Sequence, residues 1–287
     1  MTRKIVFFDI DGTIWNVHNE IPESTAEAIK RLRENGNLVF INTGRTRGYL
    51  RRPNLFALGF DGIISGAGTM IEYCSDSICS GNGDIAGRSL DTVVDREIND
   101  SNVIYYHRIE PELAEYTVIT ARQYGFRPIL EGKHHLYLED KEFAADPFGH
   151  KVITEMEEDR RNIDDCWGKW EMSKLSCATD SPDREKGLKI LEKDYHLQIH
   201  NENVCEFVPN GYGKDVGVLK LCSLLGTEIS DTFAFGDSAN DVSMLKTAGM
   251  GIAMGNGSPE AKAAADYVTD IMENGGIMNA CKYFGLI

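Results

Sequence analysis

Three short apolar runs without alternation constrain the fold of this chain more than any other feature. They cover residues 5–8, 38–41 and 232–235, and each stops at polar residues and glycine. Such runs are typical of strands buried on both faces, as in a parallel sheet. Helical patterns accompany the runs and cover Pro22–Asn35, Val216–Leu225 and Asp241–Ala248. We therefore predict an α/β fold with a doubly wound, Rossmann-like parallel sheet, in which chemistry gathers at the carboxyl ends of the strands.

The middle of the chain has a different pattern. Several strand-like pieces there alternate apolar and polar residues, which favours a half-exposed antiparallel sheet. These pieces are Val103–Tyr106, Arg127–Leu130, His135–Leu138 and Lys174–Cys177. Turn-rich junctions at Gly81–Asp84 and Pro209–Gly213 flank the region. We predict an α+β cap domain over residues 85–208, inserted into a catalytic core formed by residues 1–84 and 209–287.

The balance of charge excludes some partners. Lys+Arg 30 against Asp+Glu 45 gives a net charge of -15. Such a surface repels nucleic-acid phosphates and anionic membranes, so we expect neither as a partner. It also repels anionic substrates, so any phosphate site needs local positive charge.

Cysteine usage and hydropathy favour a cytoplasmic protein. The seven cysteines are odd in number and include no C-x-x-C pair, which indicates reduced thiols. The apolar run behind Arg3 and Lys4 is too short for an export signal, and no apolar stretch is long enough to span a bilayer. We expect a monomer or a weak homodimer.

Two carboxylates follow the first apolar run. Asp9 and Asp11, two residues apart at a strand end, can converge on one point, and Gly12 permits a tight turn around it. Hard oxygen ligands of this kind suit Mg²⁺. A turn in which the aspartates accept bonds from local amides explains the same residues equally well.

Two weaker signals concern phosphate. Thr43 and Gly44 follow the second run, and a hydroxyl with free amides at such a turn forms a phosphate-binding nest, although an ordinary capped turn is the alternative. The basic run at 45–52 is interpreted as the solvated face of a helix. Lys214, after a glycine-rich turn, can neutralise a phosphoryl oxygen or a crowded carboxylate, or simply lie on the surface.

The third run is followed by a further polar set. Asp237, Asn240 and Asp241 come after Gly236 and begin a helical pattern. An aspartate at a helix start is often only a cap. A cap accounts for one aspartate but not for the whole set.

Taken together, these four motifs resemble those of the haloacid dehalogenase superfamily of phosphotransferases. Asp-x-Asp-Gly-Thr at Asp9, Thr-Gly-Arg at Thr43, the lysine before a helix at Lys214, and Gly-Asp-x-x-Asn-Asp at Gly236 occur in the family's order. The insert between the second and third motifs is similar to the cap of the Cof-like branch. One departure is Asp215, where relatives often have glycine.

The resemblance implies a role for each matched residue. Asp9 is expected to be the nucleophile, and Asp11 the general acid and base. The Asp9 carboxylate, the Asp11 backbone carbonyl and the Asp237 carboxylate are expected to contact Mg²⁺, and Asp241 completes the metal set. The expected phosphate-binding residues are Thr43, Gly44, Lys214 and Asn240.

The charges of this set test the assignment. Four ionised aspartates with one lysine leave the pocket too negative for a phosphate dianion. A divalent cation and a proton on Asp11 make it neutral, and crowded carboxylates raise one another's proton affinity.

We therefore predict a Mg²⁺-dependent phosphoric monoester hydrolase that acts on a small phosphorylated metabolite through an aspartyl-phosphate intermediate, which the resemblance implies. A sugar phosphate is the leading candidate for the substrate. A phosphotransferase or phosphomutase with the same intermediate is the first alternative. A regulatory protein that binds a phosphometabolite without turnover is the second, but such a protein would be expected to lack Asp9 or Asp11.

Overall fold

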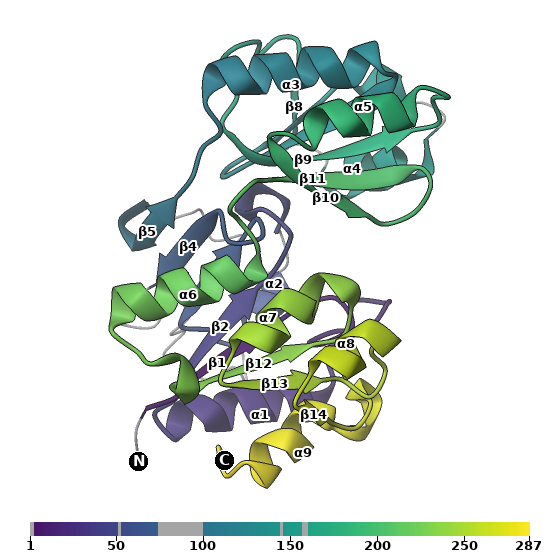
Figure 1. Cartoon of the computed structure of the whole chain (residues 1–287). Coiled ribbons are helices and arrows are strands. Elements are labelled where there is room, and N and C mark those ends of the chain that lie inside the picture. Colours follow the sequence, from purple (N-terminus) through teal and green to yellow (C-terminus); the bar gives the residue numbers. More distant parts are fainter. Residues whose placement is uncertain (1–2, 51–52, 74–99, 144–145, 157–159) are drawn as a thin grey trace. The chain divides into compact units, whose positions relative to one another are not determined.

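The structure is a computed structural model that describes residues 3–50, 53–73, 100–143, 146–156 and 160–287 (Figure 1). The chain divides into two compact units. The first comprises Met1–Gly44, Arg52–Tyr105 and Gly213–Ile287, and the second comprises Arg45–Arg51 and Tyr106–Tyr212.

The first unit is built on a sheet that has eight strands in the described part of the chain, in the order β14-β13-β12-β1-β2-β3-β4-β5. Strand β1 lies between β12 and β2 and pairs in parallel with both. Strands β3, β13 and β14 extend the parallel part, so the predicted doubly wound α/β core is confirmed. The strands are β1 (Ile5–Phe8), β2 (Leu38–Asn42), β3 (Gly62–Ser65), β4 (Met70–Tyr73), β5 (Val103–Tyr106), β12 (Thr232–Gly236), β13 (Met250–Ala253) and β14 (Tyr267–Val268).

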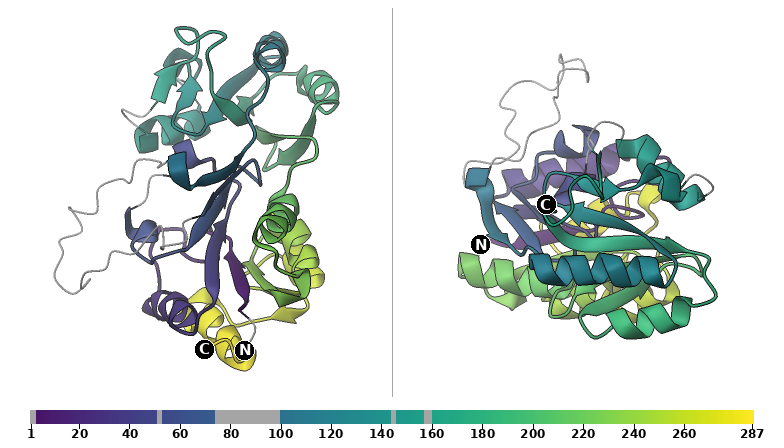
Figure 2. Two further views of the ribbon diagram at one scale, coloured as in Figure 1. Left: turned by 90° about the vertical axis from the view of Figure 1, so that its left-hand side faces the viewer. Right: turned by 90° about the horizontal axis from the view of Figure 1, so that it is seen from above.

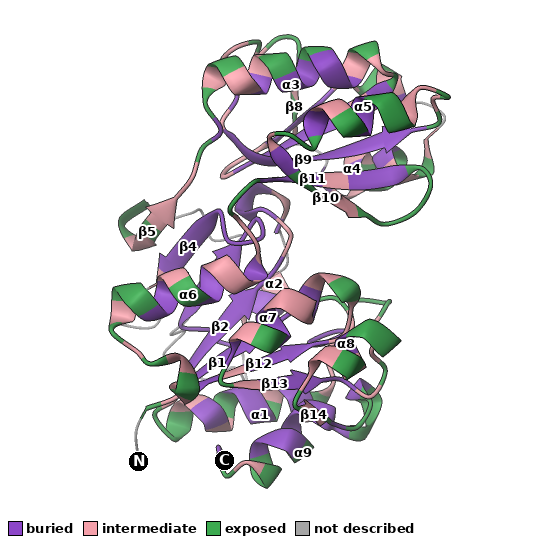
Figure 3. Cartoon of the chain, viewed as in Figure 1, coloured by how far each residue is buried: buried purple, intermediate pink, exposed green. Residues whose placement is uncertain are grey.

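Helices cover both faces of this sheet. On one face, α6, α7 and α8 pack against an apolar cluster that includes Phe7, Phe40, Leu221 and Leu245. On the other face, α1 contacts β2 and packs against α9; the left view of Figure 2 shows α1 (purple) and α6 (green) on opposite sides. Every residue of β1 is buried as a result (Figure 3). The helices are α1 (Glu23–Glu34), α2 (Pro53–Phe56), α6 (Lys214–Leu225), α7 (Val242–Thr247), α8 (Pro259–Ala264) and α9 (Gly276–Tyr283).

One predicted element of the cap belongs to the first unit instead. Val103–Tyr106 forms β5, at the edge of the first sheet beside β4. The reason is apolar contact, because Tyr105 packs against the same cluster as Tyr73 of β4. The alternating pattern predicted a half-exposed strand but did not indicate which sheet the strand joins.

The second unit contains a mainly antiparallel sheet with the strand order β10-β11-β9-β6-β7-β8. One face carries an apolar cluster that includes Val118 of α3 and Leu188 of α5, and the opposite face packs against Val152 of α4. The strands are β6 (Phe126–Gly132), β7 (Leu136–Leu138), β8 (Arg160–Asn162), β9 (Met172–Thr179), β10 (Tyr195–Ile199) and β11 (Val204–Pro209), and the helices are α3 (Pro111–Gln123), α4 (Pro147–Met156) and α5 (Arg184–Leu191).

The limits of the second unit differ from the predicted insert of 85–208. Its predicted start at 85 lies outside the described residues, and the unit runs on to Tyr212. It also includes Arg45–Arg51, which the sequence assigned to the core. Two contacts with β6 explain this assignment. The Thr46 hydroxyl donates to the Glu131 carboxylate at 3.2 Å. Gly48 lies so close to the β6 backbone that a Cβ on it would be 2.7 Å from the carbonyl oxygen of Gly132.

The basic run was therefore misinterpreted at one position. Arg47 is 5% exposed and donates to the Leu50 carbonyl at 3.1 Å, so it does not lie on a solvated helix face. Arg51 and Arg52 lie outside the described residues.

None of the helices in the described ranges has the length and apolar composition needed to cross a bilayer. Five cysteines of these ranges have free thiols, as predicted: Cys166, Cys177, Cys205, Cys222 and Cys281.

Candidate active site

The chain turns sharply just after β1. The N–H groups of Thr13, Ile14 and Trp15 all donate to the Ile10 carbonyl, at 2.9 to 3.2 Å. Gly12 permits this turn for two reasons: its φ of +85° lies in the left-handed region, and a Cβ there would lie 2.3 Å from Asp237 Oδ2. The turn leaves the Asp9 side chain, 4% exposed, at the carboxyl end of the central strand.

The loop after β12 brings a second acidic pair to the same edge. Asp241 ends a short 3-10 turn, Ala239–Asp241, and its Oδ2 accepts the N–H groups of Asp237 and Ser238, both at 3.0 Å. Ser238 completes a capping box with Asp241. The cap interpretation is thus correct for Asp241, whose carboxylate holds the backbone of the loop that carries Asp237.

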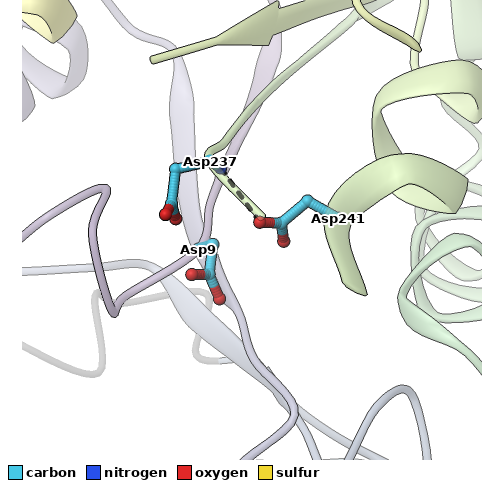
Figure 4. A group of neighbouring side chains, drawn as sticks. All are labelled: Asp9, Asp237 and Asp241. Atoms are coloured by element: carbon cyan, nitrogen blue, oxygen red, sulfur yellow. Dashed lines mark hydrogen bonds between the residues drawn. The ribbon is translucent and has the colours of Figure 1, made fainter. Parts of the chain in front are cut away.

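Three of these carboxylates converge. Asp9, Asp237 and Asp241 each offer one oxygen, and these oxygens all lie within 4.8 Å of one another (Figure 4). Asp9 comes from the end of β1, and the other two come from the segment after β12. Residues far apart in the sequence therefore meet because β1 and β12 are parallel neighbours.

Lys214 supplies the positive charge of this site. Its ammonium group donates to Asp9 Oδ1 at 2.6 Å, to Asp241 Oδ1 at 2.5 Å and to Asn240 Oδ1 at 3.5 Å. The side chain is 2% exposed. Burial would lower the pKa of Lys214, but the charges of Asp241 and Asp9 outweigh burial and raise it. Lys214 therefore stays charged.

One lysine does not neutralise the cluster. Burial and the Asp241 charge raise the pKa of Asp9 well above its ordinary value, although Lys214 opposes them. Burial and the Asp241 charge also raise the pKa of Asp237 to about 6, although a hydrogen bond from Thr13 lowers it in part. Burial is the larger cause of both shifts, and the excess of negative charge follows from the groups themselves, which are three carboxylates and one ammonium.

These donors fit a hard divalent cation. Carboxylate oxygens at this density are the ligands that Mg²⁺ prefers, and an added cation would remove the excess negative charge. The bonds of Asp241 to Lys214 and to two backbone amides hold both of its oxygens. Asp9 and Asp237 are therefore the better direct ligands, and Asp241 is better suited to hold Lys214 and the loop.

Asp11 lies apart from this cluster. Among the described residues, the carboxylates that converge are those of Asp9, Asp237 and Asp241, without Asp11. Asp11 is exposed, and its Oδ1 accepts the indole N–H of Trp15 at 3.0 Å. An exposed carboxyl group next to the cluster in sequence is suited to proton transfer.

The turn after β2 differs from the predicted nest in one respect. The Thr43 N–H donates to the Ile64 carbonyl at 2.9 Å, so the fold already uses this amide. Thr43 itself is buried. The preceding residue, Asn42, donates to the Lys214 carbonyl at 2.9 Å and so ties the end of β2 to the start of α6.

Sequence reasoning missed several residues that hold the site. The Thr13 hydroxyl donates to Asp237 Oδ1 at 3.1 Å. The Asn256 amide donates to the Gly12 carbonyl at 2.7 Å and accepts the Met272 N–H at 3.1 Å. The role of Thr13 could have been predicted, because Thr13 follows Gly12 in the first motif. No sequence pattern indicates that Trp15 or Asn256 contacts the turn around Gly12.

Comparisons with known proteins identify the family of this chain. The family model of the haloacid dehalogenase-like hydrolases matches residues 6–84 and 92–281. The Bacillus subtilis (strain 168) protein named "Putative phosphatase YkrA" is 30% identical over the whole of both chains. A second protein of that organism, named 5-amino-6-(5-phospho-D-ribitylamino)uracil phosphatase YcsE, is 27% identical over 99% of this chain and 96% of its own.

Solved structures agree on the fold. A hypothetical protein from Geobacillus kaustophilus HTA426 superimposes with a TM-score of 0.78 at 25% identity, over 99% of this chain and 100% of that one. The subclass IIB sugar phosphatase BT4131 gives a TM-score of 0.75 at 23% identity, again over 99% and 100%. The family match covers both ends of the core, with the four motifs in place, and the chain therefore belongs to the haloacid dehalogenase-like hydrolases, as the resemblance predicted.

Proposed function

We propose that this chain is a Mg²⁺-dependent phosphatase that hydrolyses a small phosphorylated metabolite through an aspartyl-phosphate at Asp9. The observation that carries the proposal is the convergence of the Asp9, Asp237 and Asp241 carboxylates beside the Lys214 ammonium, which bonds to Asp9 and Asp241. The enzyme class, a phosphoric monoester hydrolase, is confirmed by the family and by relatives named phosphatases.

In the first half-reaction, an Asp9 oxygen attacks phosphorus. The new O–P bond forms as the bond between phosphorus and the leaving oxygen breaks, and Asp11 gives its proton to that oxygen. Lys214, 2.6 Å from Asp9 Oδ1, aligns the nucleophile and offers its charge to the phosphoryl oxygens.

In the second half-reaction, a water molecule attacks the phosphorus of the aspartyl-phosphate. The Asp11 carboxylate accepts the water proton, and the bond between phosphorus and the Asp9 oxygen breaks. Inorganic phosphate leaves, and Asp9 and Asp11 return to their starting states. One residue thus acts as acid and then as base.

The remaining roles follow from position. The Asp9 and Asp237 carboxylates and the Asp11 carbonyl would hold Mg²⁺, which supplies charge neutralisation for the phosphoryl group. Asp241 and Asn240 hold Lys214 in place. We assign Thr43 and Gly44 to the phosphoryl oxygens, with the Thr43 hydroxyl rather than its amide as the donor.

We assign substrate choice to the second unit and propose a sugar phosphate as substrate. One relative is named for a phospho-ribityl compound, and one structural neighbour is named as a sugar phosphatase. A cytoplasmic location and a monomeric or weakly dimeric state complete the proposal. A phosphotransferase or phosphomutase with the same intermediate is distinguished by transfer of the phosphoryl group to a second sugar instead of release as free phosphate.

The test is a panel of phosphorylated metabolites assayed for free phosphate, with Mg²⁺ and with excess chelator. We expect release that requires Mg²⁺ and that Asp9→Asn abolishes. The matched control is Asp231→Asn, which removes a carboxylate from a lysine pair of similar length in the same unit, Lys4–Asp231 at 2.5 Å. Activity retained in Asp9→Asn, or undiminished in chelator, would refute the proposal.

A further inference from the structure

We propose that Trp15 is a positioning residue for proton transfer: its indole N–H holds Asp11 Oδ1, so that Oδ2 is the oxygen that exchanges the proton. This inference rests on the proposed role of Asp11 as general acid and base. It adds a residue that the four motifs do not include.

The contact is well defined. Trp15 Nε1 lies 3.0 Å from Asp11 Oδ1, and the tryptophan side chain is 1% exposed. The backbone fixes the same pair, because the Gly12 N–H donates to the Trp15 carbonyl at 3.0 Å and the Trp15 N–H donates to Ile10 at 3.2 Å. A large buried ring in a fixed turn has little freedom to leave its partner.

In this contact the indole can act only as the hydrogen-bond donor and Asp11 Oδ1 as the acceptor. An indole N–H donates and has no lone pair with which to accept a hydrogen bond. It can therefore bind Oδ1 whether Asp11 is ionised or carries its proton on Oδ2, but it disfavours a proton on the bonded side of Oδ1. One orientation of the carboxyl group then serves both half-reactions, first giving and later taking the proton at the same oxygen.

Each aspartate of the site has a neighbour that bonds to its side chain. Lys214 bonds to Asp9 and Asp241, and the Thr13 hydroxyl bonds to Asp237. Asp11 is exposed and accepts the Trp15 indole N–H. An exposed carboxyl group samples several rotamers unless a neighbour selects one. Trp15 is a rigid, buried neighbour that can do so.

The test is the dependence of rate on the leaving group in Trp15→Phe. p-Nitrophenyl phosphate expels a weakly basic phenolate that leaves without a proton. Phenyl phosphate and benzyl phosphate have a similar shape, but their leaving oxygens are more basic and depend more on protonation, benzyl phosphate the most. We expect kcat/KM, which reports the first half-reaction alone, to fall by about 10-fold to 100-fold on benzyl phosphate and by less than about 3-fold on p-nitrophenyl phosphate. The loss on benzyl phosphate is part of the roughly 10²-fold to 10⁴-fold that general acid catalysis supplies, because Asp11 itself is retained. Trp170→Phe is the matched control, because Trp170 is also buried and donates its indole N–H at 2.8 Å, to the Ile163 carbonyl in the second unit.

Equal losses on all three esters, or no loss, would overturn the role of Trp15. The proposed function fails in a different way, by hydrolysis that persists in Asp9→Asn. If Trp15→Phe does not fold, the indole N–H resonances of the wild-type protein, which has three tryptophans, provide the test. We expect one of them to move in Asp11→Ala, and it should be the one retained in both Trp167→Phe and Trp170→Phe; no movement would contradict the bond.

Discussion

Each unit of this protein buries one lysine between two carboxylates, and the two clusters shift the pKa values of their acids in opposite directions. In the second unit, Lys174 lies 2.5 Å from Glu206 and 3.5 Å from Glu131. Glu131 also accepts the hydroxyls of Thr46 and Ser176, and Glu206 contacts His200 at 2.9 Å. Burial alone would raise the pKa of Glu206, but Lys174 and His200 lower it to about 2.

In the first unit, the same lysine-centred pattern contains one carboxylate too many. Asp9 and Asp241 share Lys214, and Asp237 lies beside them with a pKa of about 6. In the second cluster the positive neighbours outweigh burial, whereas in the first cluster Lys214 does not outweigh burial and the neighbouring carboxylates. We therefore propose that the two similar sets of side chains serve different purposes: the second cluster stabilises its unit, and the first binds a cation and a phosphate.

Substitution of Lys214 should show the largest difference between the roles of the two clusters. We expect Lys214→Met to lower kcat about 10³-fold, because it removes a charge that stabilises the transition state. Phosphate release measured at saturating Mg²⁺ checks this. Lys220→Met, on the same helix and packed over the Tyr105 ring at 4.3 Å, is the control and should retain activity. A loss below about 10-fold in Lys214→Met would show that the lysine is structural, like Lys174.

The equivalent change in the second unit should act on stability instead. Lys174→Met leaves Glu131 buried without its lysine, and we expect the free energy of unfolding to fall by about 3 kcal/mol. Urea denaturation measures the loss. Adding Glu131→Gln should recover part of it, since the second change removes the uncompensated charge. A loss under about 1 kcal/mol would contradict a stabilising role.

Binding of Mg²⁺ should stabilise the first cluster alone. At a concentration about 100 times the dissociation constant, we expect a gain of about 2.7 kcal/mol in the free energy of unfolding. Differential scanning calorimetry with and without the ion gives the shift in Tm. The shift should vanish in Asp237→Asn and persist in Lys174→Met. An equal shift in Asp237→Asn would place the ion elsewhere.

Without metal, the two clusters should change the free energy of unfolding in opposite directions as pH rises. The pKa of Asp237 rises from 3.8 to about 6 on folding, so its contribution is full below pH 3.8 and is lost as pH rises through about 6. We expect a loss of about 1–2 kcal/mol, allowing for solvent screening of a partly exposed group. For Glu206, whose pKa falls from 4.5 to about 2, stability is full above pH 4.5 and is lost toward pH 2.

Denaturation in chelator between pH 4 and 7 measures the first effect. Asp237→Asn should flatten the curve in this range, and Mg²⁺ should do the same. A slope unchanged by Asp237→Asn would assign the effect to other groups.

The apolar runs indicated why Asp9 and Asp237 meet, because each follows a buried strand and the two strands are parallel neighbours in the sheet. Lys214 follows a glycine-rich turn at the start of α6, and it was singled out by its resemblance to a family motif. The second cluster gave no such signal. Lys174 occurs in a predicted strand whose alternation indicated a half-exposed face, yet Lys174 is 1% exposed. Glu206 lies in β11, where no strand was predicted. Alternation shows that a face is polar, but it does not show what covers that face.

Arg45–Arg51 could not be assigned from the sequence for a similar reason. The segment follows Thr43 and Gly44 directly, so continuity along the chain placed it in the core. The hydrogen bond from Thr46 to Glu131 joins residues separated by 85 positions, and no local pattern predicts such a bond. Trp15 illustrates the same limit over a short distance, because its bond to Asp11 depends on the turn around Ile10 rather than on residue type.

The order of strands also has a consequence for synthesis on the ribosome. Asp9 emerges early, but its lysine and its two neighbouring carboxylates come from beyond residue 213, and the amide that clamps Gly12 comes from Asn256. A nascent chain therefore carries the nucleophile without its partners until most of the protein has been translated. The growing polypeptide is expected to release no phosphate before its final strands have left the exit tunnel.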